Sequence, residues 1–148
     1  MWCPTCFFDR IYSGLNQKII VGGFLNRKVF EFAYKYKLNN MRKGLKHEKA
    51  SPLFDQVVFS KIKQGLGEHV RVMSSRAAPL ARHVEEFLRV VTCFHVVQDY
   101  GLTETFAGSF LFLPNVISTI GTVGPPVLNI DVCLESVPEM GYDALSEV

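Results

Sequence analysis

Residues 70–105 decide the fold of this chain, and they read VRVMSSRAAPLARHVEEFLRVVTCFHVVQDYGLTET. The mostly apolar runs 70–74 and 94–98 are typical of buried strands. Between them lies a stripe of apolar residues, Leu80, Val84, Phe87, Leu88 and Val91. Their spacing, mostly three and four residues, predicts a helix that packs on a sheet. The strand–helix–strand order predicts a right-handed parallel crossover and an α/β fold.

Small and polar residues follow both predicted strands. Residues 74–79 come after the first strand, and residues 99–105 come after the second. The carboxyl ends of neighbouring parallel strands lie at one edge of a sheet, and open α/β sheets bind ligands outside that edge. The sequence therefore predicts that both stretches line one cleft.

The second stretch has the composition of a nucleotide-phosphate site. Tyr100 offers a ring that can lie against a base, and Gly101 allows a sharp turn close to a ligand. The hydroxyl of Thr103 can donate to a phosphate oxygen, and the carboxylate of Glu104 can hold Mg²⁺. An ordinary loop after a strand could carry the same residues, so six positions alone do not decide between the two interpretations.

Three motifs in one order carry a family resemblance. Residues 100–104 read YGLTE, residues 74–80 read SSRAAPL, which is similar to SGAAPL, and residues 121–126 read GTVGPP. Together they resemble the adenylate-forming synthetases, most closely the plant long-chain acyl-CoA synthetases. The resemblance implies that residues 1–148 are a fragment of the AMP-binding domain, with residues 1–8 unmatched. It also implies a partial parallel sheet with packed helices from the large domain, followed by a strand-and-turn segment.

The resemblance implies roles for the residues that follow the first strand and end the second. Ala77, Ala78 and Pro79 would form the wall against the adenine and the acyl carbonyl. Gln98 would lie near the edge of the adenine. The alternative interpretation of residues 77–79 is a strand-to-helix turn with no ligand-binding role, because proline favours the first turn of a helix.

The resemblance also implies roles for the loop after the second strand. Tyr100 would stack on the adenine, with Gly101 beside it in the nucleotide-binding turn. Thr103 would contact the α-phosphate and Glu104 would hold Mg²⁺, and these two are the predicted catalytic residues. Gly124 would belong to a turn that supports the site. The alternative for Tyr100 is a core aromatic.

Acyl-CoA synthetases use ATP to convert a fatty carboxylate to an acyl-adenylate, and CoA then displaces AMP. The resemblance therefore implies a long-chain fatty-acid–CoA ligase with fatty acid, ATP, CoA and Mg²⁺ as substrates and cofactors. The family's lysine-containing phosphate loop is not found in these 148 residues, and neither is the small domain with its catalytic lysine. We expect that this fragment alone does not complete the reaction.

Two residues inside the motifs depart from the family pattern. The family usually has glycine where Arg76 and Asp99 stand. If either position requires a positive φ or a close backbone approach, the side chain would strain the site by about 1–3 kcal/mol. Asp99 would also bring negative charge near a polyphosphate. Both changes predict weaker nucleotide binding.

Other elements are predicted from local patterns. Residues 24–45 read as an amphipathic helix, in which Leu25, Val29, Phe32, Ala33, Tyr36 and Met41 form the apolar stripe. A second helix begins at Ser51-Pro52, with Leu53, Val57, Ile62 and Leu66 on one face, and stops at Gly65 and Gly67. The alternation of Ile130, Val132 and Leu134 with polar residues predicts a half-buried strand.

Charge is unevenly distributed along the chain. Lys and Arg crowd the N-terminal third, whereas residues 100–148 contain no Lys, Arg or His. The commoner explanation is a solvated helix face, and no nucleic-acid partner is predicted. The alternative function is a non-catalytic short protein that binds a lipid or membrane surface through the basic helix 24–45. The compartment stays open, because the family occurs at the endoplasmic reticulum membrane and in peroxisomes.

The cysteines do not predict a metal centre. Cys3 and Cys6 have the spacing of half a zinc knuckle, but no second pair follows. Cys93 and Cys133 lie in apolar surroundings and are predicted to be small core residues.

Overall fold

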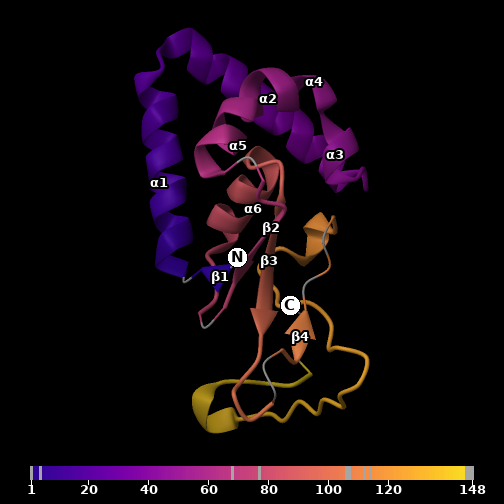
Figure 1. The fold of residues 1–148 in the computed structure, drawn as a ribbon. Coiled ribbons are helices and arrows are strands. Elements are labelled where there is room, and N and C mark those ends of the chain that lie inside the picture. Colours follow the sequence, from indigo (N-terminus) through magenta and orange to yellow (C-terminus); the bar gives the residue numbers. More distant parts are fainter. Residues whose placement is uncertain are drawn as a thin grey trace.

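The computed structural model describes residues 2–3, 5–67, 69–76, 78–105, 108–111, 113 and 115–145. Helices gather around one part of a small sheet (Figure 1). The chain after the third strand is largely irregular: part of it extends beyond the carboxyl end of the strands, and residues 115–120 return beside the helices. The predicted α/β class is confirmed. No described helix is long and apolar enough to cross a membrane.

The described strands form one mixed sheet in the order β1 (Trp2–Cys3), β2 (Val72–Ser75), β3 (His95–Tyr100) and β4 (Phe110–Leu111). β1 and β3 both run parallel to β2, and β4 pairs antiparallel with β3. In the register of β2 and β3, Met73 lies opposite Val96 and Ser75 lies opposite Gln98. The two strands predicted around residues 70–98 are thus confirmed as parallel neighbours, each displaced by one or two residues.

Helix α6 (Arg82–Val91) joins these two strands and carries much of the core. The five apolar residues of the predicted stripe are all buried, including Leu80, which lies just before the helix. At its end the hydroxyl of Thr92 donates to the carbonyl of Leu88 at 2.7 Å, and Cys93 adopts a positive φ of 56°. The helix therefore turns directly into β3 with its apolar face against the sheet.

Two long helices precede this unit. α1 (Thr5–Val21) was not predicted, whereas α2 (Phe24–Arg42) confirms most of the helix predicted over 24–45. The predicted apolar stripe of α2 is largely wrong, because Leu25 is 79% exposed and Phe32 is 63% exposed. Ala33 and Met41 of that stripe are buried, and the buried face also contains Lys37 and Leu38, which were not part of it. Apolar residues occur on both faces of α2, and periodicity alone does not say which face meets the core.

The predicted second helix begins and ends as expected but is not a regular α-helix. After α3 (His47–Ala50), the chain runs through α4 (Pro52–Phe54), a π-helical stretch η1 (Asp55–Phe59) and α5 (Ser60–Leu66). Gly67 ends it with a φ of +105°. The wider π turn changes which side chains share a face. Leu53 and Val57 are therefore exposed, whereas Ile62 and Leu66 pack against the core.

The strand predicted around 130–134 is wrong. Residues 127–136, all of which are described, contain no strand, and Val132, Cys133 and Leu134 are exposed. The prediction that Cys133 is a core residue is wrong for the same reason. Alternation fits a strand, but a strand also needs a neighbour to pair its backbone groups. Two 3₁₀ turns, η2 (Ile117–Thr119) and η3 (Pro138–Met140), are the regular elements described after β4.

Lys37 does not belong to a solvated basic face. Its side chain is fully buried, and its ammonium pairs with Asp55 Oδ1 at 2.6 Å. The same nitrogen lies 5.2 Å from the ring centroid of Phe59, and Ser51 donates to Asp55 Oδ1 at 3.1 Å. The pair fixes α2 against the π-helical stretch, because a buried lysine is tolerated when an opposite charge compensates it.

Replacing Lys37 by alanine is expected to lower the free energy of unfolding by about 3 kcal/mol, because it leaves the half-buried Asp55 carboxylate without its cation. Lys35→Ala is the matched control, since Lys35 is exposed on the same helix. That variant should change stability by less than about 0.5 kcal/mol. Urea unfolding followed by circular dichroism measures both, and equal losses in the two variants would contradict the assignment.

Candidate functional site

The three motif segments meet beyond the carboxyl ends of β2 and β3. The first follows Ser75 and the second follows Tyr100, where the two strands end. The third is brought beside the second by β4, because Phe110 pairs with both Tyr100 and Pro126. Ser109 N donates to the carbonyl of Tyr100 at 2.8 Å, and Val127 N donates to the carbonyl of Ser109 at 3.0 Å. The first two segments thus lie at one edge of the sheet, as predicted, and the third lies beside them.

A buried hydrogen-bond network joins the three segments. Gln98 Oε1 accepts from the backbone N–H of Leu80 at 2.8 Å, which ties the first segment to β3, the strand that leads into the second segment. Gln98 Nε2 donates to Glu85 Oε2 at 2.6 Å, and the backbone N–H of Gly121 donates to the same oxygen at 2.9 Å. One carboxylate oxygen thus links β3, just before the second segment, to the third segment.

Glu85 is fully buried, and Arg89 compensates its charge from one turn along α6. Arg89 Nε lies 3.2 Å from Glu85 Oε1 and donates to the carbonyl of Val96 at 3.0 Å. Burial raises the pKa of the Glu85 carboxyl, and the N–H of Gly121, the charge of Arg89 and the amide of Gln98 oppose that rise. Burial also lowers the pKa of Arg89 to about 10. Both groups are held in place by contacts within the chain.

Sequence reasoning did not single out Glu85 or Arg89, although a signal was present. The two lie four residues apart on α6, next to the apolar stripe members Val84 and Leu88. Opposite charges at this spacing pair along a helix, and charges so close to a buried stripe need a partner. The pattern marks an internal ion pair, but it does not reveal the partners that come from β3 and from the third segment.

Gln98 lies deeper than its predicted place beside an adenine. The residue is 4% exposed, and both ends of its amide are used within the chain. In this arrangement Gln98 fixes the end of the first segment, at Leu80, relative to α6. Of the three residues predicted to form the wall beside the adenine, Ala78 and Pro79 are exposed. Ala77 lies outside the described residues.

The loop after β3 presents its functional candidates to solvent. Tyr100 is 46% exposed, and its ring meets Phe110 edge to face with 5.9 Å between centroids, so it is not a core aromatic. Thr105 closes the loop, because its hydroxyl bonds both the N–H and the carbonyl of Leu102 at 3.0 and 3.1 Å. Thr103 and Glu104 stand exposed within this closed turn. The carboxylate and the hydroxyl are therefore both accessible to a ligand.

The turn of the third segment contains two glycines that adopt positive φ angles. Gly121 has a φ of +85° and Gly124 a φ of +83°. This conformation suits glycine, which lacks the Cβ that would clash. It lets Gly121 aim its N–H at the Glu85 carboxylate and lets the chain turn back toward β4.

Arg76 and Asp99, the two departures from glycine, contact each other. Arg76 Nη2 and Nε both reach Asp99 Oδ2, and Ser74 donates to the other carboxylate oxygen. The Asp99 side chain is 4% exposed and the Arg76 side chain is 22% exposed. Neither residue has a positive φ, so neither carries the backbone strain expected for a residue in a left-handed conformation. The two charges thus compensate each other beside the carboxyl ends of β2 and β3.

A double-mutant cycle tests this mutual compensation. Arg76→Ala and Asp99→Ala should each destabilise the chain, and the double variant should lose about 1–3 kcal/mol less than the sum, because one buried partner strands the other. The exposed pair Arg27–Glu31, with a separation of 2.9 Å, is the control. Its coupling should stay below about 0.5 kcal/mol. Additive losses at positions 76 and 99 in denaturant unfolding would show that the pair is not coupled.

Known proteins are similar to this chain along nearly its whole length. The family model described as AMP-binding enzyme matches residues 11–147. Long chain acyl-CoA synthetases 3 and 4 of Arabidopsis thaliana are each 61% identical over 149 residues, 97% of this chain and 22% of their own length. Fatty acyl-CoA synthetase B of Dictyostelium discoideum is 40% identical over 151 residues, 98% of this chain and 22% of its own length. No solved structure matches the chain.

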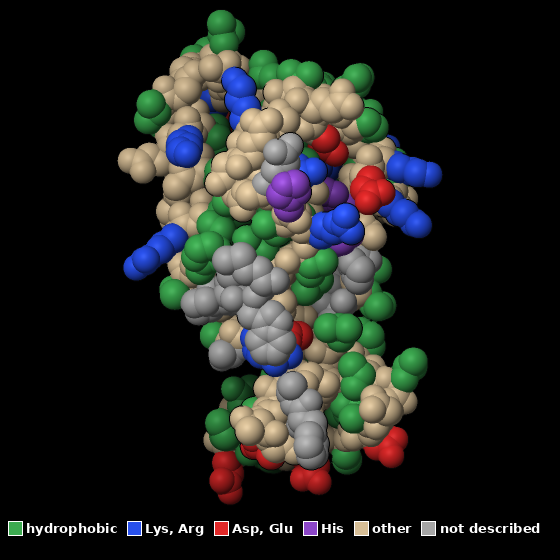
Figure 2. Space-filling view, in the orientation of Figure 1, with side chains coloured by type: hydrophobic (Ala, Val, Ile, Leu, Met, Phe, Trp, Pro, Cys, Tyr) green, Lys and Arg blue, Asp and Glu red, His purple; other side chains and the backbone are tan. Residues whose placement is uncertain are grey.

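The chain therefore spans 22% of the length of these relatives. The uneven distribution of charge along the sequence is also visible on the surface. In Figure 2 the end of the molecule formed by the irregular segment shows acidic and no basic side chains.

The family match takes in all three motif segments and the strands and helix that position them. On that basis the chain belongs to the family of AMP-binding enzymes.

Proposed function

We propose that this chain forms part of the nucleotide site of a long-chain fatty-acid–CoA ligase. The relatives that are 61% identical carry the name long chain acyl-CoA synthetase. The observation that carries the proposal is the meeting of three motif segments through Glu85 and Gln98. Since the chain spans 22% of those relatives, we assign to it contacts with the nucleotide and leave the complete reaction to a longer ligase.

In the proposed reaction the fatty carboxylate attacks the α-phosphorus of ATP. An acyl–phosphate bond forms, and the bond to the departing pyrophosphate breaks. The thiolate of CoA then attacks the acyl carbonyl and AMP leaves with the bonding electrons. Such chemistry depends on the positioning of reactants and on stabilisation of charge. The rigid network under the motif segments supplies that positioning, because its donors and acceptors are buried and paired within the chain.

Each candidate residue of the nucleotide site has a proposed role. The Tyr100 ring, with 46% of its surface accessible, would stack on the adenine. The Thr103 hydroxyl would donate to an α-phosphate oxygen, and Gly101 would let the backbone approach the ligand. Ala78 and Pro79, together with Ala77, would form the wall beside the adenine and the acyl carbonyl. Gln98 would act from below, by holding that wall in place.

Glu104 fits a magnesium site that is completed by the substrate. Within the described residues, no three His, Cys, Asp or Glu side chains group closely enough to hold a metal by themselves. Mg²⁺ commonly binds one or two carboxylates together with substrate phosphates and water, and Glu104 offers one exposed carboxylate in the closed turn. Bound there, Mg²⁺ would neutralise charge on the polyphosphate. CoA would supply the thiol in the longer enzyme.

Titration calorimetry with MgATP and with a non-hydrolysable acyl-adenylate analogue tests the proposal. Glu104→Ala should weaken MgATP binding at least tenfold, because one magnesium ligand is lost, and should have less effect on the analogue, which has no polyphosphate. Tyr100→Ala should weaken both, since stacking contributes about 1–3 kcal/mol. Glu135→Ala, at an exposed carboxylate outside the site, is the control. Equal MgATP affinities for Glu104→Ala and Glu135→Ala would refute the role of Glu104.

A second candidate function, membrane-surface binding, rests on the corner between α1 and α2. Its apolar side chains are unusually exposed, with Phe24 at 73% and Leu25 at 79%. Val21 at the end of α1 is 79% exposed as well. Lys28 lies over the Phe24 ring at 5.0 Å, so a cation accompanies the apolar tip. Apolar tips with flanking lysines suit the interface of an anionic bilayer.

Vesicle flotation separates this second candidate from the first. The chain should float with phosphatidylserine-containing vesicles and much less with phosphatidylcholine alone. The double variant Phe24→Ser with Leu25→Ser should abolish flotation. Leu128→Ser with Leu134→Ser is the control, because both of those leucines are exposed far from the corner in the sequence. Equal flotation of the two double variants would contradict a membrane role for the α1–α2 corner.

A further inference from the structure

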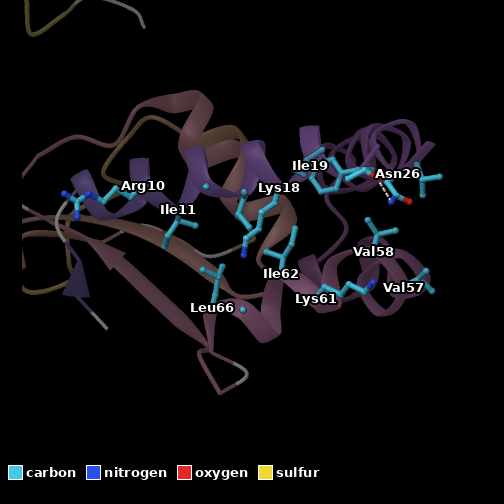
Figure 3. Close-up of a pocket in the computed structure, with 16 residues that line it drawn as sticks. Arg10, Ile11, Lys18, Ile19, Asn26, Val57, Val58, Lys61, Ile62 and Leu66 are labelled. Carbon is cyan, nitrogen blue, oxygen red and sulfur yellow. Dashed lines mark hydrogen bonds between the residues drawn. The ribbon is translucent and has the colours of Figure 1, made fainter. Parts of the chain in front are cut away.

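A groove of about 630 Å³ lies among α1, the first part of α2 and the helical path η1–α5. Branched apolar side chains form its facing walls, from α1 on one side and from η1 and α5 on the other. Figure 3 shows members of the two walls pointing toward each other across the groove. Gly14 and Gly65 also line it, and a Cβ added at either position would meet nothing within 4 Å. The groove therefore has open space between two apolar walls.

The charges along the groove are of one sign. Arg10, Lys18 and Lys61 line it, and none of the described residues that line it is acidic. The ion pairs found among the described residues include none of these three cations. Arg10 and Lys18 lie eight residues apart on α1, which places them about 12 Å apart along the helix. A complementary surface carries apolar side chains together with negative charges at a similar spacing.

The chain itself contains such a surface in residues 128–135, the acidic strip, which reads LNIDVCLE. Its apolar residues alternate with polar residues or cysteine, and among them Leu134 is 73% exposed and Val132 is 43% exposed. Asp131 and Glu135 are exposed as well, and the strip has no basic residue. The strip therefore offers the apolar side chains and the negative charges that the groove lacks.

The backbone of the acidic strip is available to a partner. Residues 131–135 contain no helix, strand or turn, and none of the described residues shares a backbone hydrogen bond with them. When such a run is extended, the four residues from Asp131 to Glu135 span about 13 Å. This span is close to the separation of about 12 Å between the two cations on α1. An extended strip can therefore place both carboxylates beside the cations of the groove.

The two surfaces of one copy lie apart. The acidic strip belongs to the part of the chain that extends beyond the carboxyl ends of the strands, whereas the groove lies among the helices (Figure 1). No residue of the strip lines the groove. All 16 Lys and Arg occur in residues 1–99, whereas residues 100–148 contain six acidic residues and no Lys, Arg or His. Two copies that meet head to tail therefore bring opposite charges together, and contacts between like ends are disfavoured.

We infer that the groove of one copy of this chain binds the acidic strip of a second copy. The apolar side chains of the strip lie between the two walls of the groove, and its carboxylates pair with the cations beside them. The second copy keeps its own groove free for a third, so the contact builds open-ended assemblies rather than a closed dimer. The inference does not rest on the proposed nucleotide site, because no residue of the three motif segments lines the groove or belongs to the strip.

Sedimentation velocity of the chain over a series of concentrations tests the inference. The weight-average sedimentation coefficient should rise with concentration past the value of a dimer, because each added copy leaves a groove unfilled. Raising the salt from about 0.15 M to about 1 M should weaken the association at least about threefold, because the Debye length falls from about 8 Å to about 3 Å. A monomer at every concentration, or a closed dimer, would overturn the inference.

Charge reversal identifies the two surfaces. Arg10→Glu with Lys18→Glu reverses the groove, and Asp131→Lys with Glu135→Lys reverses the strip, all at exposed side chains. Each variant alone should associate at least about tenfold more weakly than the parent chain, because like charges then face each other. An equimolar mixture should recover association, since the reversed strip fits the reversed groove and the two unaltered surfaces fit each other. A mixture that stays monomeric would overturn the inference.

The matched control for the reversed groove is Lys28→Glu with Lys35→Glu. Both lysines are exposed on α2 and neither lines the groove. The control changes the net charge as much as the reversed groove does, and it should associate as the parent chain does. Equal losses of association in the two variants would show an effect of net charge alone and would overturn the assigned contact.

Filling the groove tests its apolar part. Gly14→Leu with Gly65→Leu occupies the open space and should weaken self-association at least about tenfold. The change should not unfold the chain, because leucine favours a helix interior more than glycine does, and the melting temperature checks this. Ser13→Leu is the control, since Ser13 is exposed on α1 and does not line the groove. Unchanged association of the filled variant would overturn the inference.

A last variant separates the groove from the apolar corner between α1 and α2. Phe24→Ser with Leu25→Ser removes two exposed apolar side chains of that corner, and neither residue lines the groove. This variant should associate as the parent chain does. If it is monomeric while the filled groove still associates, the corner holds the copies together and the inference fails.

Discussion

The carboxylate of Glu85 is the constraint on which the arrangement of the motif segments depends. Its Oε2 accepts from a side chain of β3 and from a backbone N–H of the third segment, while Arg89 balances its charge from within α6. A buried carboxylate with unpaired oxygens is costly, so the position of each partner is tightly defined. Gln98 extends the same requirement to the first segment through the N–H of Leu80. The exposed residues of the motif segments thus lie above a polar network that is largely buried.

The central unit could be predicted because its information is local. The periods of β2, α6 and β3 lie within thirty consecutive residues, and the pairing of the two strands followed from their connection by one helix. Packing of α2 could not be predicted in the same way. Its sequence has apolar residues on two faces, and the buried face includes Lys37, whose partner Asp55 lies 18 residues away. From the sequence alone a lysine is expected to be exposed, because the buried partner that would compensate its charge is not identified by local pattern.

The candidate site likewise has a part that local sequence predicts and a part that depends on contacts between residues distant in the sequence. The motif segments were found from their residues and their resemblance, and the strand ends supplied a reason for them to meet. The supporting residues Glu85 and Arg89 were not predicted. The contacts of Glu85 come from 13 and 36 residues along the chain, and those of Arg89 from 7 and 27 residues. Arg76 and Asp99 were noticed as separate departures from glycine. Only their contact reveals that the two charges cancel, so a ligand at this edge would meet a neutral pair rather than an isolated carboxylate.

The two hydrogen-bond partners of Glu85 lie at different separations along the chain, and this difference bears on the order in which the site forms. The contact with Gln98 closes a loop of 13 residues within the β2–α6–β3 unit, whereas the contact with Gly121 must close one of 36 residues. Longer loops cost more entropy to close, and segments with exposed backbone open before the core does. We therefore expect the contact with Gln98 to form before the third segment docks, and transient opening to release the third segment first. Amide hydrogens of the third segment would exchange with solvent while those of β3 stay protected.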